Sequence, residues 1–115
     1  MEVRLLDPPW GATPTRIWAR PTVNLIDNAA VTPEEATVLL ADAESGMGPP
    51  LDPKQFNFAN PDLTVFFARR PADTSIGLEV FSIAGDAGVG LSEARLFDSA
   101  GVFGRSAQSL VIAPR

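Results

Sequence analysis

The sequence predicts an α+β fold in which an antiparallel β-sheet surrounds one buried helix. A helix start at residues 32–35 leads into an apolar stretch, two short strand-like segments precede it, and long strand-like segments without proline follow between Ala72 and Ala113. A helix that is apolar nearly all round needs cover on most sides. In a chain of 115 residues, a sheet curled over the helix is the simplest cover.

The segments before the helix are expected to be two strands. Residues 1–6 are short and extended, and residues 16–22 carry Ile17 and Trp18 in a β-favouring context. Turn-forming residues at positions 7–11 separate the two segments.

The helix start is the clearest local signal in the chain. Thr32 is an N-cap hydroxyl, Pro33 takes the first helical position, and Glu35 completes a capping box. The apolar residues expected to share one face of this helix are Ala36, Leu39, Leu40 and Ala43. Val38 and Ala41 are expected on the other side.

The remainder of the chain after the loop at 46–53 is strand-like. The expected strands are residues 55–58, 63–69, 75–84, 89–97 and 102–112. Residues 85–88 and 98–101 have the composition of hairpin turns. The pattern therefore predicts a meander of long antiparallel strands after the helix.

Composition excludes several classes of function. The chain has no Cys and no His, so we expect no disulfide, no Ser-His-Asp triad, no His or thiolate metal site and no bound cofactor. A net charge of −5 argues against nucleic acid as a partner. No apolar run is long enough to span a membrane, and residues 1–4 lack a signal region, so cytoplasmic residence is the default expectation.

Several segments, taken in order, resemble the C-terminal half of the acyl-CoA thioesterase II family, whose members are double hotdogs. The segments that carry the resemblance are residues 1–4, 16–20, 39–42, 58–65, 96–98 and 104–108. The resemblance implies that residues 1–115 form a single hotdog domain, a curved antiparallel sheet wrapped around one central helix. It also implies thioesterase activity on acyl-CoA or a related thioester.

The same resemblance implies three site residues. In that family an Asp, a Thr and a Gln position the water that attacks the thioester carbonyl, and these positions fall on Asp42, Asn60 and Gln108. Asn60 departs from the family's Thr, because an amide is not a hydroxyl donor of the same shape. The loop at 43–46 also departs and adds Glu44, a second carboxylate near the site. The family's N-terminal hotdog is missing from this sequence.

The residues themselves leave plainer alternatives open. Asp42 is a charged residue in an apolar helix and lies near the helix C-terminus, where the helix dipole disfavours an anion by about 0.3–1 kcal/mol. A role as general base would explain this position, and so would simple exposure in the last turn. Asn60 precedes a proline and could simply cap its own turn. Gln108 could be an ordinary residue on a sheet face.

Strand alternation gives Gln108 an expected direction. The face expected to point inward holds Val102, Gly104, Ser106, Gln108, Leu110 and Ile112. The face expected to be wetter holds Phe103, Arg105, Ala107, Ser109 and Val111. Gln108 would then lie inside, beside Gly104 and Ser106, whose small size leaves room for a ligand or a water.

An acyl chain needs an apolar tunnel. The candidate residues for its lining are Leu39, Leu40, Met47, Phe56 and Phe58, although plain core packing explains all of them as well. Two functions follow: hydrolysis of an acyl-CoA thioester, or a non-catalytic acyl-binding or structural hotdog that supports a partner chain. We expect pairing with a second hotdog domain, either another copy or a separate chain, because hotdog sheets have open edges.

Overall fold

The computed structural model describes residues 2–5, 15–21, 31–43, 51–52, 54–85 and 87–115. Its elements in chain order are β1 (Glu2–Leu5), β2 (Thr15–Arg20), α1 (Pro33–Asp42), β3 (Phe56–Ala59), β4 (Thr64–Phe67), β5 (Ile76–Ala84), β6 (Val89–Asp98) and β7 (Gly101–Pro114). Within the described part of the chain, no helix has the length and apolar character that a membrane span requires.

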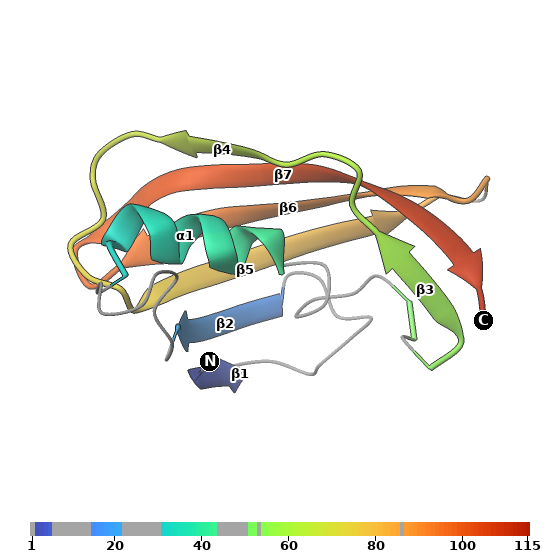
Figure 1. Cartoon of the computed structure of the whole chain (residues 1–115), viewed down its shortest axis with the longest axis horizontal. Coiled ribbons are helices and arrows are strands. Elements are labelled where there is room, and N and C mark those ends of the chain that lie inside the picture. Colours follow the sequence, from blue (N-terminus) through green and yellow to red (C-terminus); the bar gives the residue numbers. More distant parts are fainter. Residues whose placement is uncertain (1, 6–14, 22–30, 44–50, 53, 86) are drawn as a thin grey trace.

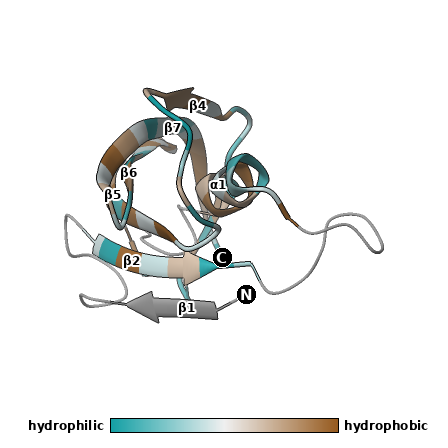
Figure 2. Ribbon diagram, turned by 90° about the vertical axis from the view of Figure 1, so that its left-hand side faces the viewer, coloured by the Kyte–Doolittle hydropathy of each residue, from teal (hydrophilic) through white to brown (hydrophobic). Residues whose placement is uncertain are grey.

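The described strands form one antiparallel sheet around the helix. Their order is β1-β2-β5-β6-β7-β3, and β4 also pairs with β7 (Figure 1). Viewed along the helix, the sheet curls from β2 on one side of α1, past β5 to β7, to β4 on the other (Figure 2). The predicted α+β architecture, a curved antiparallel sheet around one helix, is confirmed.

The start of α1 follows from its capping box. The backbone N–H of Glu35 donates to Thr32 Oγ1 at 3.1 Å, and the backbone N–H of Thr32 donates to Glu35 Oε1 at 3.1 Å. Both donors would lack an intrahelical partner without these contacts. The helix ends at Asp42, where the N–H of Ala43 donates to the carbonyl of Leu40 at 3.2 Å.

The buried face of α1 differs from the predicted one. Ala36, Thr37, Leu40 and Ala41 are buried, whereas Leu39 and Ala43 are half-buried. Thr37 fits inside because its hydroxyl donates to the carbonyl of Pro33 at 2.8 Å and needs no other partner. Val38 is 45% exposed, so the helix buries one face and is not covered all round.

The inner face of the sheet supplies the core. The buried cluster around α1 consists of Ile17, Ala19, Ala36, Leu40, Ile76, Leu78, Val80, Ala94, Leu96 and Phe103. Burying a large aliphatic side chain stabilises a fold by about 1.5–3 kcal/mol. The strands that carry this cluster are thereby held firmly against the helix.

A β-bulge corrects the expected alternation at the start of β7. Phe97 pairs with Val102 but Leu96 pairs with Gly104, which leaves Phe103 as the extra residue. Phe103 is 0% exposed and Val102 is 56% exposed, the reverse of the prediction. Beyond the bulge the predicted alternation is confirmed, because Ser106, Gln108, Leu110 and Ile112 are buried.

On the side away from β6, β7 pairs with two short strands that are separated by a gap. β4 pairs with residues 104–107 of β7, and β3 pairs with residues 111–114. Between them, the carboxylate of Asp62 accepts hydrogen bonds from the backbone N–H of Ser109 at 2.7 Å and from its hydroxyl at 3.2 Å. A side chain thus replaces a strand at this point.

Gly104 lies on the edge covered by β4. A Cβ at this position would run into the carbonyl oxygen of Phe66. The space that Gly104 was expected to leave for a ligand is therefore filled by the backbone of β4.

An ion pair fastens the β6–β7 turn to the segment between β4 and β5. Arg69 donates from both terminal nitrogens to Asp98, at 2.9 and 2.7 Å, and the backbone N–H groups of Ala72 and Ala100 donate to the same carboxylate. The Arg69 hydrogen bonds hold the pKa of Asp98 well below its usual range. Arg69 also lies over the ring of Phe103, 5.8 Å from its centroid.

Candidate active site

Asp42 and Asn60 meet at the end of the helix. Asp42 is the last residue of α1 and is exposed, and Asn60 follows directly after β3. Asn60 Nδ2 donates to Asp42 Oδ1 at 3.1 Å, across 18 positions of sequence. Pro61 favours an extended backbone at Asn60, which brings the amide out of β3 toward the helix. Among the described residues, Asp42 Oδ2 has no hydrogen-bond donor.

Gln108 approaches the same helix end from the sheet. It lies on the inner face of β7 and is 1% exposed. Its Nε2 donates to the carbonyl of Ala41 at 3.0 Å, one residue before Asp42. The carbonyls in the last turn of a helix lack intrahelical donors, which makes them natural acceptors for this amide. The structure therefore gathers all three residues of the predicted site at the C-terminus of α1.

The other half of the Gln108 amide has no partner. Its Oε1 is buried and accepts no hydrogen bond from any described residue. Buried polar atoms are nearly always hydrogen-bonded in native proteins, to protein or to ordered water. The orientation of the amide is set by Ala41, because a flip would bring two oxygens together. Oε1 is thus a fixed acceptor beside the helix end.

The predicted lining residues occupy different environments. Leu39, Phe56 and Phe58 are half-buried, whereas Leu40 is 0% exposed and belongs to the core cluster. Met47 lies outside the described residues, as does Glu44 of the divergent loop. In the described part of the chain, no group of three or more carboxylates is placed to hold a metal ion.

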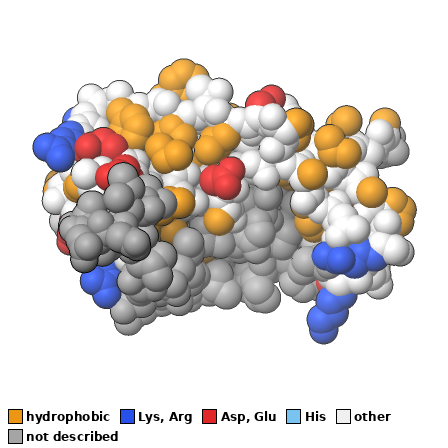
Figure 3. Space-filling view, viewed as in Figure 1, with side chains coloured by type: hydrophobic (Ala, Val, Ile, Leu, Met, Phe, Trp, Pro, Cys, Tyr) orange, Lys and Arg blue, Asp and Glu red, His pale blue; other side chains and the backbone are white. Residues whose placement is uncertain are grey.

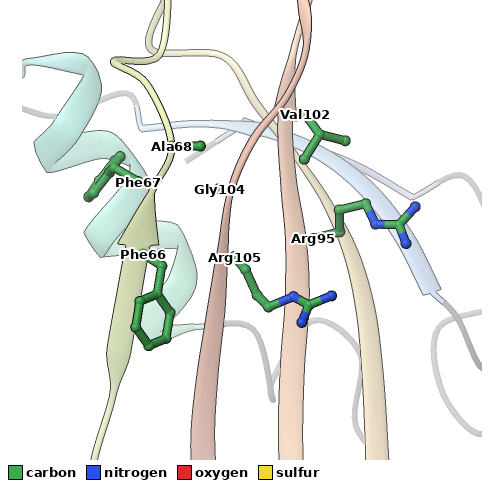
Figure 4. A pocket seen from close by; sticks show the side chains of 7 residues that line it. All are labelled: Phe66, Phe67, Ala68, Arg95, Val102, Gly104 and Arg105. Atoms are coloured by element: carbon green, nitrogen blue, oxygen red, sulfur yellow. The ribbon is translucent and has the colours of Figure 1, made fainter.

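A groove on the opposite face of the sheet is separate from this site. It encloses about 360 Å³ between β4 and the first half of β7, and it includes Phe66, Val102, Arg95 and Arg105. Figure 4 shows the two arginines reaching from neighbouring strands. Arg105 is exposed and Gln108 is buried, so the groove and the amide lie on different sides of the sheet.

A second hollow lies at the interruption between β3 and β4. It encloses about 180 Å³ and is lined by Asp62, Thr64, Leu91, Ala107, Gln108 and Ser109. It reaches β7 at Gln108 from the outside, and Asp62 belongs to the same connection as Asn60. The interruption in the sheet edge is therefore next to Gln108 of the candidate site.

Sequence comparison identifies the family. Residues 3–112 match the sequence profile described as the acyl-CoA thioesterase C-terminal domain. No curated protein matches the sequence significantly.

Solved structures show the same fold. A hypothetical protein from Staphylococcus aureus matches with a TM-score of 0.70 at 10% identity, covering 98% of this chain and 94% of that one. A thioesterase from Haemophilus influenzae matches with a TM-score of 0.67 at 10% identity, covering 97% of this chain and 78% of that one.

The acyl-CoA thioesterase II TesB2 from Mycobacterium marinum matches with a TM-score of 0.67 at 21% identity. The match covers 99% of this chain and 49% of TesB2, so the chain spans about half the length of that protein. These likenesses show the hotdog fold, and the profile match shows the family. The chain belongs to the acyl-CoA thioesterase family, in which it corresponds to the C-terminal domain.

Proposed function

We propose that the chain hydrolyses an acyl-CoA thioester, using a water molecule held by Asp42, Asn60 and Gln108. The observation that carries the proposal is the hydrogen bond from Asn60 Nδ2 to Asp42 Oδ1, made beside the helix end that binds the amide of Gln108. The helix dipole disfavours an anion at this end, so stability alone gives no reason for Asp42.

Each side chain has a separate task in this reaction. Asn60 fixes one oxygen of the Asp42 carboxylate and leaves Oδ2 for the water. Gln108 Oε1 accepts the second hydrogen of that water. Two acceptors that each bind one hydrogen turn a lone pair of the water toward the carbonyl carbon, which is orientation of the kind that lowers a barrier by proximity.

Asp42 acts as the general base. As the water oxygen bonds to the thioester carbon, one water proton passes to the Asp42 carboxylate. The carbon–sulfur bond of the tetrahedral intermediate then breaks, and the departing thiolate takes that proton. The products are a carboxylic acid and the free thiol of CoA. General-base catalysis of this kind contributes about 10²–10⁴-fold in rate.

The acyl group would lie against apolar side chains beside the site. Leu39, Phe56 and Phe58 are the predicted lining residues that remain partly accessible. Leu40 is enclosed by the core and would support the lining from behind. Such a substrate would place the activity in the cytoplasm, where acyl-CoA is formed and used.

We infer that a second hotdog domain completes the assembly, as another copy or as a partner chain. Exposed hydrophobic side chains lie along β4 and α1 and again at the far end of the strands (Figure 3). Phe66 and Phe67 on β4 are 60% and 41% exposed, and β4 pairs with β7 alone. The native mass of the purified chain distinguishes a monomer from a paired state.

A second candidate function is a non-catalytic hotdog that supports a partner chain. The feature that favours it is Asn60, because the family resemblance places a Thr at this position and an amide is not a hydroxyl donor of the same shape. A chain of this kind would bind acyl-CoA without releasing CoA.

Release of free thiol from acyl-CoA tests the two candidates. The chain has no Cys, so a thiol reagent reports the product without background from the protein. Asp42→Asn should lower kcat by about 10²-fold or more, because the amide cannot take a proton. Its Tm should match wild type, since Asp42 is exposed.

Asp73→Asn is the matched control, because Asp73 is another exposed carboxylate and its hydrogen bonds are local. This variant should retain the wild-type kcat. Equal rates for wild type and Asp42→Asn would remove Asp42 from the mechanism. No release by any form, together with binding of acyl-CoA, would select the non-catalytic role.

A further inference from the structure

A row of three polar side chains crosses the inner face of the sheet at the level of the helix end. Ser82 on β5 pairs directly with Ser92 on β6, and Ser92 pairs directly with Gln108 on β7. Directly opposite residues of an antiparallel pair have their Cβ atoms about 4.5–5.5 Å apart. Ser92 therefore adjoins both Ser82 and Gln108 beside the candidate site.

The neighbouring rows emphasise the polarity of this one. On one side Val80 lies opposite Ala94, which pairs with Ser106. On the other side Ala84 lies opposite Gly90, which pairs with Leu110. The row formed by Ser82, Ser92 and Gln108 thus crosses a largely apolar surface. Ser92 is 0% exposed and Gln108 is 1% exposed.

The hydrogen bonds within the row leave one donor and one acceptor unused. Ser82 Oγ donates to Ser92 Oγ at 3.1 Å. With Ser82 as the donor of this hydrogen bond, the single hydrogen of the Ser92 hydroxyl is directed elsewhere. The adjacent buried acceptor without a partner is Gln108 Oε1. The two atoms make no direct hydrogen bond, so a single bridging oxygen would satisfy both.

We propose that Ser92 is a fourth residue of the thioesterase site and donates its hydroxyl hydrogen to the water bound by Gln108 Oε1. This inference rests on the proposed function. The four tetrahedral directions of that water are then all assigned. Its two hydrogens go to Gln108 Oε1 and to the Asp42 carboxylate, one lone pair accepts from Ser92, and the other faces the thioester carbon.

Ser82 is a positioning residue in this arrangement. By donating to Ser92 Oγ, it occupies an acceptor site of that hydroxyl and directs the Ser92 hydrogen toward β7. The row of side chains then runs in one direction, from Ser82 through Ser92 and the water to Gln108. Neither serine takes up or releases a proton in the reaction, so the balance of the hydrolysis is unchanged.

Kinetics of Ser92→Ala and Ser92→Thr test the proposal. Ser92→Ala should lower kcat for acyl-CoA hydrolysis about tenfold while KM stays near wild type, since one neutral hydrogen bond to the water is lost. Ser92→Thr retains the hydroxyl and should recover most of that loss. Ser82→Ala should have a smaller effect on kcat, because it acts through Ser92.

Ser106→Ala is the matched control, because Ser106, like Ser92, is a buried serine on the inner face of the sheet. It lies on β7 and outside the row. It should leave kcat unchanged even if it changes the Tm. A kcat for Ser92→Ala equal to wild type would overturn the proposal, as would a loss that Ser92→Thr fails to recover at unchanged Tm.

A crystal structure at atomic resolution tests the proposal independently of enzymatic activity. The expected result is one water within hydrogen-bond distance of both Ser92 Oγ and Gln108 Oε1, lost in Ser92→Ala. A direct Ser92–Gln108 hydrogen bond without water would overturn the inference. If wild type is inactive while this water is present, the proposed function fails and the water site stands as a structural one.

Discussion

Asn60 holds the carboxylate of Asp42 by an amide hydrogen bond of 3.1 Å, and the two residues come from different layers of the fold. Asp42 is the last residue of α1 and Asn60 directly follows β3, so their contact joins the helix end to the sheet edge. The family resemblance places a Thr at position 60. The donor has therefore changed from a hydroxyl to an amide at this position.

The contact predicts opposite results for two substitutions of Asn60. Asn60→Leu removes the donor and should lower kcat about 10- to 100-fold, because a hydrogen bond to a charged group is lost. Asn60→Thr restores a donor and should retain more activity than Asn60→Leu. Thiol release measures both. An Asn60→Leu variant with wild-type kcat would show that Asp42 needs no support from this residue.

The pair formed by Arg69 and Asp98 predicts a loss of stability in acid. Hydrogen bonding to Arg69 lowers the pKa of Asp98 in the folded chain, so the unfolded chain binds a proton first as the pH falls. The contribution of Asp98 to stability is therefore complete above the ordinary Asp pKa of about 4, and it declines as the pH falls below that value.

Asp98→Asn measures this contribution. It should lower the free energy of unfolding at pH 7 by about 1.5–3 kcal/mol, because hydrogen bonds to a charged group are weakened. Urea unfolding at several pH values should show the difference from wild type shrinking below pH ~4. The exposed Asp73→Asn serves as control. A difference that stays constant down to pH ~2.5 would contradict this account of the pair.

The bulge at the start of β7 predicts unequal costs for two adjacent truncations. Phe103→Ala should destabilise by about 3–5 kcal/mol, since it empties a fully buried site. Val102→Ala should change stability by less than about 0.5 kcal/mol, because its side chain is mostly in solvent. Thermal unfolding compares the two. The reverse order would restore the simple alternation that the sequence suggests.

Local signals explain what could be predicted from the sequence. The capping box at Thr32 and Glu35 places the helix start because both hydrogen bonds lie within one turn. The hairpin turns likewise depend on adjacent residues. Asp42, Asn60 and Gln108 came from a family resemblance, and the structure brings them together, while their roles remain predictions.

Other features depend on partners far away in the chain. Arg69 pairs with Asp98 across 29 positions of sequence. No local sequence pattern around Arg69 predicts that Asp98 is its partner.

The register of β6 against β7 shows why Ser92 could not be found from sequence. The turn pairs Asp98 with Gly101, and a straight ladder from there would place Ser92 opposite Ala107. The extra residue at Phe103 moves the register by one, and Ser92 then lies opposite Gln108. A one-residue shift exchanges the two faces of a strand. The bulge thus decides which side chains face the helix.

The Asp62 carboxylate that stands in for a strand beside Ser109 also bears on solubility. A long, uniform sheet margin is a template on which other chains can stack, and proteins guard against it with short strands and charge. Here the margin beside β7 is divided into two strands of four residues each, with an acidic side chain at the break. By this principle, the divided border offers only short stretches of backbone for strand addition, and β4 lies on the outer side of β7 as one of them.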